Sequence, residues 1–519
     1  MTHYVMPPVW PTVVHMLDDA ARRSPDGQAL VCDDERLTYR QYAACVSGLA
    51  RRLQQAGLGF GERVVLFMGN SVDIAIATFA VQAAGAQVVP LNPAYTVSEL
   101  SQVLDNAGAR GVFYDEAVAG VIDQVASRFD FLCRIGNDHG AERLTVWNDQ
   151  PELADALPLP EPDWPSTLQY TGGTTGVPKG VSLTHGAVAT NVSQREALLP
   201  TRPDRERILA ITPLFHVYAV SMGLYLSANC RGTLVIVARY RPDIVLDHIS
   251  RHQITLMSGS PTIFMGLMGF EGFAQANLSS LRLCFSGSSA LAAETLRRWE
   301  AATGCTVCEG YGQTEAGPVL AYNPFEGERK IGTVGVAVPL TELQIVDVEH
   351  GERVLGTGEI GEIRARGPQV MSGYYGRPAE TAEALRGGWL YTGDIGVLDD
   401  DGYLTICDRK KEMVIVSGFN VYPREIEEVL FRHPGVREAA VVGVPDDYRG
   451  EILVAYVVGQ GQVPTTDDLM AYVAQHLVKY KWPARVVWMD DLPKTSVGKV
   501  DKKRIRELAL NSGDTATQP

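Results

Sequence analysis

Short apolar runs alternate with helical stretches over most of the chain. Residues 63–70 and 86–93 are apolar runs that end in Gly, Asn or Pro, as buried strands do where they meet a loop. Capping boxes, in which a Thr and a Gln or Glu three residues later cover the first turn, predict helices at 38–53 and from 96 onwards. This alternation predicts a parallel sheet whose strands are joined by crossover helices.

The pattern begins again after a glycine-rich stretch at residues 170–180. Ligands of open α/β sheets collect beyond the carboxyl ends of the strands, so the Gly, Pro, Ser and His residues that end most of the later runs should line a site. Those strand-like runs are 207–216, 233–240, 254–261 and 281–291. Residues 332–393 contain many glycines and short alternating runs, which predict a small β-rich subdomain.

The chain changes character again near residues 408–412, DRKKE. Short apolar runs, a turn at 417–420 and a helix beginning at Pro423 predict a compact α+β unit beyond that point. We therefore expect an α/β protein with a large N-terminal domain, residues 1–409, and a small C-terminal domain, residues 410–519. The large domain should hold two doubly wound α/β subdomains and the β-rich subdomain. The last residues, NSGDTATQP, have the composition of a disordered tail.

Composition narrows the function classes. The hydrophobic content of 45% and charged content of 21% are ordinary for a globular protein, and a net charge of −15 argues against a nucleic-acid-binding protein. We expect neither a secretory signal nor a membrane-spanning run. The eight scattered cysteines indicate reduced thiols, as in the cytoplasm. Cys305 and Cys308 are predicted to pack in a buried strand, because no second Cys pair or nearby His completes a zinc site.

The stretch from Tyr170 to Gly180 reads YTGGTTGVPKG. Glycines allow backbone N–H groups to converge on an anion, threonine hydroxyls add donors, and Lys179 adds a positive charge. These features predict a triphosphate site. The stretch is not the P-loop of kinases and GTPases, because it does not contain the G-x-x-x-x-G-K-[ST] pattern.

Other polar residues close further predicted strands. His216 lies among apolar residues and fits the wall of an apolar pocket, and Glu315 offers an oxygen ligand for Mg²⁺. Asp394 is a carboxylate suited to two ribose hydroxyls, Arg409 adds a positive charge, and Lys499 follows a glycine turn near the C-terminus. Taken singly, each of these residues has an equally good structural explanation, as a core histidine or a solvated charge.

Together, and in this order, the motifs resemble those of the adenylate-forming enzymes: acyl-CoA synthetases, luciferases and peptide-synthetase adenylation domains. The resemblance covers nearly the whole chain. The segments TGGTTG, EGYG, GPQVMSGYYGRP and DRKKEMVIVSGFNVYP are most similar to those of bacterial medium- or long-chain fatty acyl-CoA ligases. The resemblance implies that residues 1–409 form an AMP-binding domain and that the C-terminal domain is mobile about a hinge near Lys411.

The resemblance also implies roles for matching residues. The glycine loop and Lys179 would hold the β- and γ-phosphates, Lys499 would contact the α-phosphate and the substrate carboxylate, and Glu315 would bind Mg²⁺. The catalytic set would be Lys499, Thr174, Lys179, His216 and Glu315. The full ATP- and AMP-binding set would be Thr171, Gly172, Gly173, Thr174, Thr175, Lys179, Ser288, Gly310, Tyr311, Gly312, Thr314, Asp394, Arg409, Lys411 and Lys499.

For the other two substrates, the resemblance implies a CoA site at Arg239, Ser417 and Gly418. The implied acyl pocket consists of His216, Tyr218, Val220, Met222 and Gly312. Acetate-specific relatives carry a bulky Trp where this chain has Gly312, so we expect depth for a medium or long acyl chain. There are two departures from the family pattern. Gly172 replaces the more common Ser, and Ile415 and Val416 replace lysines that coumarate ligases and luciferases carry.

We therefore expect an ATP-dependent acyl-CoA ligase that uses ATP, Mg²⁺ and coenzyme A, forms an acyl-AMP and then transfers the acyl group to CoA. Three alternatives stay open: a ligase for aryl or other carboxylates, a stand-alone adenylation enzyme that loads a carrier protein, and a non-catalytic nucleotide-binding protein. We expect no nucleic-acid partner and at most peripheral membrane contact, and a homodimer stays open.

Overall fold

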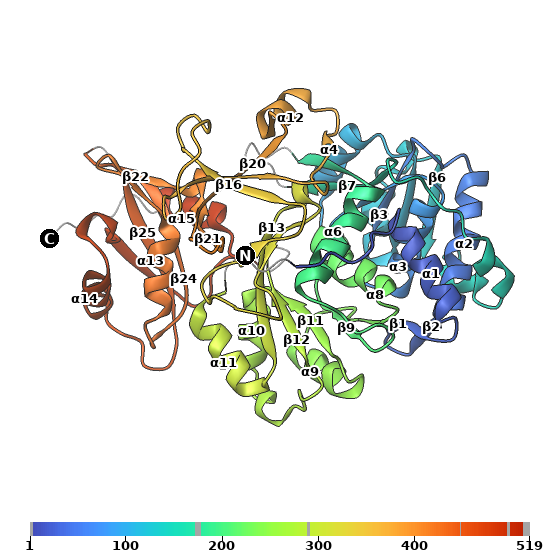
Figure 1. Ribbon diagram of the computed structural model, residues 1–519, viewed down its shortest axis with the longest axis horizontal. Helices are drawn as coiled ribbons and strands as arrows, with labels where there is room; N and C mark the ends of the chain where they lie inside the picture. Colours follow the sequence, from blue (N-terminus) through green and yellow to red (C-terminus); the bar gives the residue numbers. More distant parts are fainter. Residues whose placement is uncertain (1–3, 172–177, 288–290, 447, 496–498, 512–519) are drawn as a thin grey trace.

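The computed structural model describes residues 4–171, 178–287, 291–446, 448–495 and 499–511. Figure 1 shows a large body built from most of the chain and a smaller body, in orange and red, built from its C-terminal part. The expected disordered tail, residues 511–519, lies almost wholly outside the described residues.

The first layer of the large body is a seven-stranded sheet in the order β18-β8-β7-β4-β3-β5-β6. The strands from β7 to β6 in this order are parallel, and β8 and β18 add an antiparallel edge. Their bounds are β3 (Arg63–Phe67), β4 (Gln87–Pro90), β5 (Gly111–Asp115), β6 (Phe131–Ile135), β7 (Pro165–Thr171), β8 (Lys179–Thr184) and β18 (Gly373–Tyr374). Both predicted capping boxes are present, at the start of α2 (Tyr39–Gln55) and α4 (Val97–Ala107).

The second layer is a nine-stranded sheet in the order β15-β14-β13-β12-β11-β9-β10-β1-β2, whose central strands are parallel. Its strands are β1 (Gln28–Cys32), β2 (Glu35–Thr38), β9 (Arg207–Ala210), β10 (Thr233–Ile236), β11 (Leu256–Gly259), β12 (Leu283–Ser286), β13 (Thr306–Gly312), β14 (Val319–Tyr322) and β15 (Val336–Ala337). The two sheets confirm the prediction of two α/β subdomains. The run predicted at 207–216 is a strand only as far as Ala210, and the rest is a loop, because Pro213 cannot donate to a sheet ladder.

Helices cover and connect these two sheets (Figure 1). Besides α2 and α4 they are α1 (Val13–Arg23), α3 (Val72–Ala83), α5 (Ala119–Ile122), α6 (His185–Leu198), α7 (Val217–Ala219), α8 (Leu226–Asn229), α9 (Pro242–Arg251), α10 (Pro261–Met268) and α11 (Ala293–Thr303). A π-helical segment, Val220–Tyr225, joins α7 to α8. Helices of this wide type occur mostly as short insertions, often at functional sites.

The β-rich subdomain and the C-terminal domain each contain a five-stranded sheet. The first comprises β16 (Glu342–Val346), β17 (Gly361–Arg366), β19 (Leu385–Arg386), β20 (Trp389–Leu398) and β21 (Leu404–Arg409), with α12 (Pro378–Ala384) beside it. The second comprises β22 (Val414–Val416), β23 (Phe419–Val421), β24 (Val436–Asp446), β25 (Gly450–Gly459) and β26 (Arg485–Met489). Its helices are α13 (Pro423–Phe431), α14 (Thr466–His476) and α15 (Lys502–Asn511). The chain passes from one sheet to the other between Arg409 and Val414, close to the boundary that we predict.

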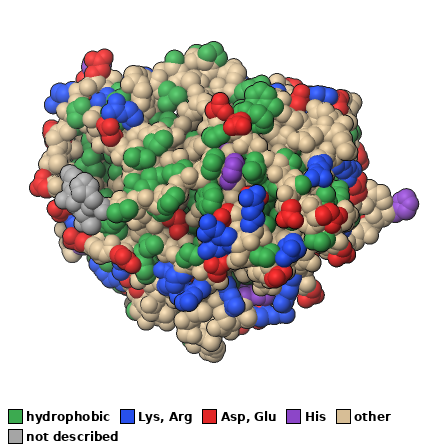
Figure 2. Space-filling model, turned by 45° about the vertical axis from the view of Figure 1, so that its right-hand side comes forward, with side chains coloured by type: hydrophobic (Ala, Val, Ile, Leu, Met, Phe, Trp, Pro, Cys, Tyr) green, Lys and Arg blue, Asp and Glu red, His purple; other side chains and the backbone are tan. Residues whose placement is uncertain are grey.

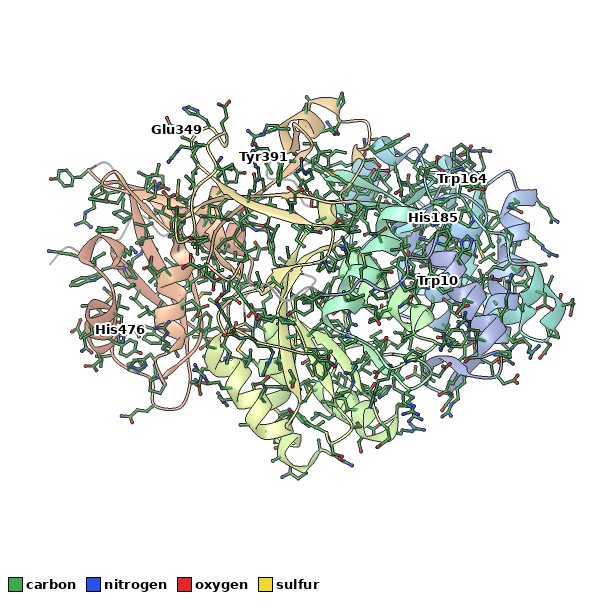
Figure 3. The ribbon with its side chains drawn as sticks, viewed as in Figure 1. Trp10, Trp164, His185, Glu349, Tyr391 and His476 are labelled. Atoms are coloured by element: carbon green, nitrogen blue, oxygen red, sulfur yellow. The ribbon has the colours of Figure 1, made fainter. Side chains whose placement is uncertain are left out.

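Thiols and a histidine ring are buried in the core. The eight cysteines are free thiols, and Cys305 and Cys308 are buried as expected, with the Cys305 sulfur 3.5 Å from that of Cys284. His185, labelled in Figure 3 beside Trp164, is fully buried, and burial lowers its pKa to about 3. Its ring is therefore neutral at physiological pH.

The surface is mixed in character. On the face that Figure 2 shows, basic side chains lie among acidic and hydrophobic ones. Within the described ranges, none of the helices combines the length and apolar character that a bilayer crossing requires.

Candidate functional site

The site is built around Asp394, whose carboxylate is buried where β20 meets β21. Asp394 and Arg409 are directly paired across these two strands, and the Arg409 Nε lies 3.4 Å from Asp394 Oδ1. The hydroxyl of Tyr311, on β13, donates to Asp394 Oδ2 at 2.6 Å. Burial raises the pKa of Asp394, and Arg409, Tyr311 and the lysines Lys411 and Lys499 act against that rise. Three of the predicted nucleotide-binding residues therefore meet at one point.

Lys499 reaches this point from the C-terminal domain. Its carbonyl oxygen accepts the backbone N–H of Thr495 at 2.7 Å, and its own backbone N–H donates to the Thr495 hydroxyl oxygen at 3.2 Å. Burial and, to a smaller extent, the charge of Arg409 lower the pKa of Lys499 to about 8, while Asp394 opposes this shift. A lysine whose charge is removed from water beside another cation is poised to receive an anion.

His216 comes from a third part of the chain, where it caps the start of α7. Its Nδ1 accepts the backbone N–H of Tyr218 at 3.3 Å, which fixes the ring at the helix start. Burial lowers the pKa of His216 to about 4, and the charge of Lys499 adds to the effect. The ring is therefore neutral, and it faces the same space as Lys499.

A second group links the predicted phosphate and metal residues. The hydroxyl of Tyr374, on β18, donates to Glu315 Oε1 at 2.8 Å, and the Lys179 Nζ lies 5.1 Å from the centre of the same ring. Since Thr171 and Lys179 are paired across β7 and β8, the strands hold the two ends of the glycine loop side by side. Gly172, Gly173, Thr174 and Thr175 lie outside the described residues, as does Ser288.

Tyr374 is absent from the predicted site. It lies in the segment GPQVMSGYYGRP, which contributes to the resemblance, but nothing local shows that a tyrosine 59 residues from Glu315 would bond to it. Tyr374 lies on β18, which pairs with β8, and the backbone N–H of Met371, three residues earlier, donates to the carbonyl oxygen of Glu315 at 2.9 Å, so contacts between distant segments bring the two side chains together. Thr314 and Glu315 begin a single 3₁₀ turn directly after β13, which places both residues at the end of that strand.

The glycines of the EGYG turn have packing reasons of their own. A Cβ at Gly310 would lie 2.1 Å from the ring of Tyr322, and a Cβ at Gly312 would lie 1.9 Å from the carbonyl oxygen of Pro318. Any side chain at Gly312 would therefore collide with backbone, whatever acyl group is bound. The absence of a Trp at this position is then weaker support for a deep pocket than the sequence suggests.

The remaining predicted pocket residues divide into two kinds. His216 and Tyr218 are half-buried at the site, whereas Val220 and Met222 are buried in the main hydrophobic core, within the π-helical segment. The Tyr322 hydroxyl donates to that of Tyr218 at 3.3 Å.

The predicted CoA residues face solvent in this arrangement. Ser417 and Gly418 form the two-residue turn of the β22–β23 hairpin, with φ angles of 51° and 84°, as a type I′ turn requires. Both are exposed, and so is Arg239 after β10. The structure therefore presents Lys499 to the site and leaves the Gly418 turn outside it.

The chain near Lys411 is held from both sides. The Lys410 Nζ lies 2.8 Å from the buried Glu362 of β17, and Glu412 lies 3.0 Å from Arg506 of α15. Lys411 is the exposed residue between a residue tied to the large body and one tied to the small domain.

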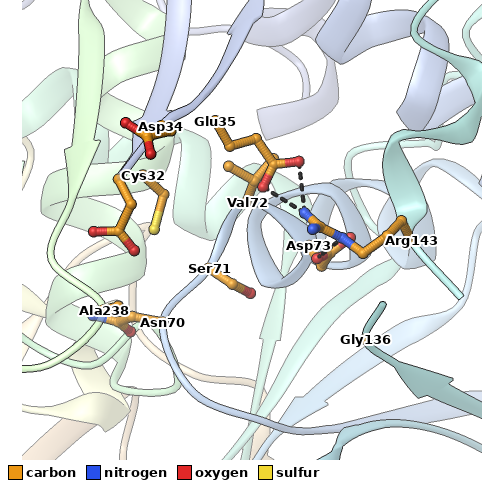
Figure 4. A pocket seen from close by; sticks show the side chains of 11 residues that line it. Cys32, Asp34, Glu35, Asn70, Ser71, Val72, Asp73, Gly136, Arg143 and Ala238 are labelled. Atoms are coloured by element: carbon orange, nitrogen blue, oxygen red, sulfur yellow. Dashed lines mark hydrogen bonds and ion pairs between the residues drawn. The ribbon is translucent and has the colours of Figure 1, made fainter. Parts of the chain in front are cut away.

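A cavity of about 340 Å³ lies away from these groups, between the β1–β2 turn and the start of α3 (Figure 4). Asp33, Asp34, Glu35 and Asp73 line it, and Arg143 is paired with Glu35 and Asp73. Its excess of carboxylates is unsuited to a triphosphate.

Comparisons with known proteins agree with this geometry. The AMP-binding enzyme family matches residues 17–375, and the AMP-binding enzyme C-terminal domain matches residues 425–499. The chain belongs to the AMP-binding enzyme family. More narrowly, it is a member of the AMP-forming acid–thiol ligases, the acyl-CoA synthetases.

Two curated relatives have different substrates in their names. A long-chain-fatty-acid–CoA ligase of Salmonella typhimurium is 35% identical, over 98% of this chain and 97% of its own. A feruloyl-CoA synthase of an Amycolatopsis species is 36% identical, over 94% of this chain and 96% of its own.

Solved structures bear on the domain arrangement. ATP-bound MatB of Rhodopseudomonas palustris is 32% identical and superposes with a TM-score of 0.88, covering 95% of this chain and 98% of that one. Apo MatB of the same organism is also 32% identical. It covers 96% of this chain and 98% of its own, and superposes with a TM-score of 0.80. The arrangement of this AMP-binding enzyme is thus more similar to the ATP-bound form.

Lys499 generates the first prediction. Lys499→Ala should slow acyl-AMP formation about 10²–10³-fold, the usual loss on removing one preorganised charge contact, and should leave conversion of added acyl-AMP to thioester largely intact. Because Lys499 is charged only below its pKa of about 8, kcat/KM for acyl-AMP formation should fall above about pH 8 in the wild type.

The matched control is Lys499→Arg, whose guanidinium stays charged throughout that range. Its activity should be lower, but the decline above pH 8 should disappear. ATP–pyrophosphate exchange measured from pH 6 to 10 tests this, and an identical decline in the arginine variant would contradict the assignment.

Tyr374 generates the second prediction. Tyr374→Phe keeps the ring below Lys179 and removes the donor that orients Glu315. The Mg²⁺ concentration for half-maximal acyl-AMP formation should rise about tenfold, the lower end of the loss seen when a ligand's hydrogen-bond partner is removed. Tyr375→Phe at the next residue serves as the control, and an unchanged Mg²⁺ dependence in Tyr374→Phe would refute this role.

Proposed function

We propose that this chain is an ATP-dependent acyl-CoA ligase that activates a medium- or long-chain fatty acid. The observation that carries the proposal is the placement of Lys499, which comes from the C-terminal domain and lies beside Asp394, Arg409 and His216. A half-buried cation at the junction of two domains suits a reaction in which a carboxylate attacks the α-phosphate of ATP. Two anions must meet there, so catalysis depends on positioning and charge neutralisation.

In this proposal Asp394 and Arg409 hold the ribose, and Lys179 with the glycine loop holds the β- and γ-phosphates. Tyr311 already occupies one Asp394 oxygen and orients the other toward the site. Thr314 and Lys499 contact the α-phosphate. The neutral His216 ring provides a wall beside the acyl carboxylate without competing for its charge.

Glu315 is the residue that would bind Mg²⁺. Among the described residues no cluster of three or more metal-binding side chains is found, and this fits Mg²⁺, which commonly uses one or two carboxylates together with substrate phosphates. Bound there, the ion would neutralise charge on the phosphates. Glu315 has its second oxygen available, since only Oε1 accepts from Tyr374.

The second half-reaction requires a different domain position. CoA would approach past Ser417 and Gly418, and Arg239 would meet one of its phosphates. Because the Gly418 turn faces solvent while Lys499 occupies the site, we infer that the small domain rotates about Lys411 after the acyl-AMP forms. We take 1–409 and 410–519 as the two domains, and we expect the enzyme to act in the cytoplasm.

The substrate assignment follows the names of the fatty-acid relatives and the apolar surroundings of His216. The second candidate is an aryl acid, which the ring pair Tyr218 and Phe285, 6.1 Å apart and edge to face, would suit. ATP–pyrophosphate exchange with acids from acetate to palmitate, and with benzoate and cinnamate, decides between the two. CoA-thioester formation then separates a ligase from an enzyme that loads a carrier protein. Acetate as the best substrate would refute the proposal.

The hinge generates the third prediction. Proline at residue 411 would fix φ near −65°, which a 3₁₀ turn accepts, and would restrict the torsion change that rotation needs. Lys411→Pro should therefore retain most acyl-AMP formation and lose thioester formation.

Lys411→Ala is its control, because it removes the side chain and leaves the backbone free, so it should keep thioester formation. Both half-reactions are measured separately, by pyrophosphate exchange and by conversion of added acyl-AMP. Equal loss of both steps in Lys411→Pro would point to misfolding, and loss of neither would exclude a hinge at this residue.

A further inference from the structure

Arg195 is a fully buried arginine on α6. Its Nη1 donates to Glu196 Oε1 at 2.6 Å and to the carbonyl oxygen of Leu199. Its Nε and Nη2 meet no acceptor anywhere in the described part of the chain. Buried donors are nearly always satisfied, because leaving one unpaired forfeits its hydration. These two donors therefore point to an acceptor that the protein's described residues do not provide.

Aromatic side chains surround the guanidinium. Its central carbon lies 5.1 Å from the ring centre of Phe285, and that ring meets Tyr218 edge to face. Tyr218 accepts a hydrogen bond from Tyr322, and no acceptor for its own hydroxyl hydrogen is found among the described residues. Burial raises the pKa of Tyr322 to about 12, while its bond to Tyr218 and the charge of Arg195 oppose that rise. We call Arg195, Tyr218, Phe285 and Tyr322 the tyrosine–arginine cluster.

The cluster adjoins the proposed acyl site. Tyr218 lies in α7, two residues after the capping residue His216, and its ring is 3.4 Å from the Cβ position of Gly287, just after β12. The Tyr322 ring occupies the space above Gly310, where no Cβ would fit. An acid whose carboxylate lies beside His216 and Lys499 would direct its far end toward these hydroxyls.

We propose that the tyrosine–arginine cluster binds an uncharged oxygen at the far end of the substrate acid, so that the preferred substrate carries a hydroxyl, phenol or ether oxygen there. This inference rests on the proposed ligase activity and concerns the end group of its acid, whether that acid is the fatty acid or the aryl candidate. The end group is uncharged because Glu196 already neutralises Arg195, so an ω-carboxylate would meet no net positive charge. Tyr218 and the free Arg195 donors would bind the oxygen, and the rings would pack against the carbons before it.

The experiment compares kcat/KM in ATP–pyrophosphate exchange for matched pairs of acids. 8-Hydroxyoctanoate against octanoate tests an aliphatic source of the oxygen, and 4-hydroxycinnamate against cinnamate tests an aryl source. Suberate tests a charged end. We expect at least one hydroxylated acid to exceed its partner by about tenfold or more, since hydrogen bonds to charged groups discriminate at this level. The pair with the larger kcat/KM ratio shows whether the preferred acid is aliphatic or aromatic.

Variants then assign that ratio to the cluster. Arg195→Met, similar in volume and without donors, and Tyr218→Phe should each reduce the hydroxyl-to-hydrogen ratio toward one. Arg282→Met is the matched control: Arg282 also packs on an aromatic ring, Phe325, but it pairs with Glu206 outside the cluster. Its ratio should stay at the wild-type value.

The outcomes separate the two proposals. Equal kcat/KM within both pairs, octanoate with 8-hydroxyoctanoate and cinnamate with 4-hydroxycinnamate, or an unchanged ratio in both Arg195→Met and Tyr218→Phe, would overturn the inference and leave the proposed function standing. A preference for suberate would contradict the proposal that the end group of the substrate is uncharged. Exchange with acetate alone, or with none of the acids, would instead refute the proposed function. If Arg195→Met does not fold, Tyr218→Phe decides, because it removes one hydroxyl and keeps the ring.

Discussion

The buried carboxylate of Asp394 is the constraint on which the rest of the site depends. A charge removed from water needs partners, and Asp394 has Arg409 across the strand pair and Tyr311 from the neighbouring sheet. These contacts join β13 of the nine-stranded sheet to the β-rich subdomain. They also create a negatively charged point that a cation from the small domain can approach, and Lys499 does so.

The sequence predicts a large part of this arrangement, because local patterns determine it. Capping boxes, apolar runs and the polar residues that end them predict the helices, the parallel sheets and the strand end where Glu315 lies, whereas Asp394 lies within β20 of an antiparallel sheet. The two sheets, the β-rich subdomain and the family are confirmed by the structure and the comparisons. The individual roles of the site residues stay predictions.

What the sequence does not predict depends on contacts between distant segments. Tyr374 becomes part of the site because β18 pairs with β8 and Met371 bonds to the backbone of Glu315, and no local pattern encodes either contact. In the sequence Arg195 is indistinguishable from a surface residue of a helix, yet its side chain in α6 is fully buried. Gly312 suggests an open pocket, whereas the backbone of Pro318 explains the glycine directly.

Electrostatics gives a physical reason for the domain motion that we propose. Lys499 and Arg409 are both positive and both act on Asp394, and burial together with the charge of Arg409 disfavours the charged form of Lys499 and lowers its pKa while the site holds no anion. A triphosphate between them would turn that repulsion into attraction and hold the small domain in the position that the structure shows. Once pyrophosphate departs, only a single phosphate charge would remain to offset the two cations. The attraction would weaken at the step where Lys499 must leave the site, so the same charges that favour adenylation would favour its release.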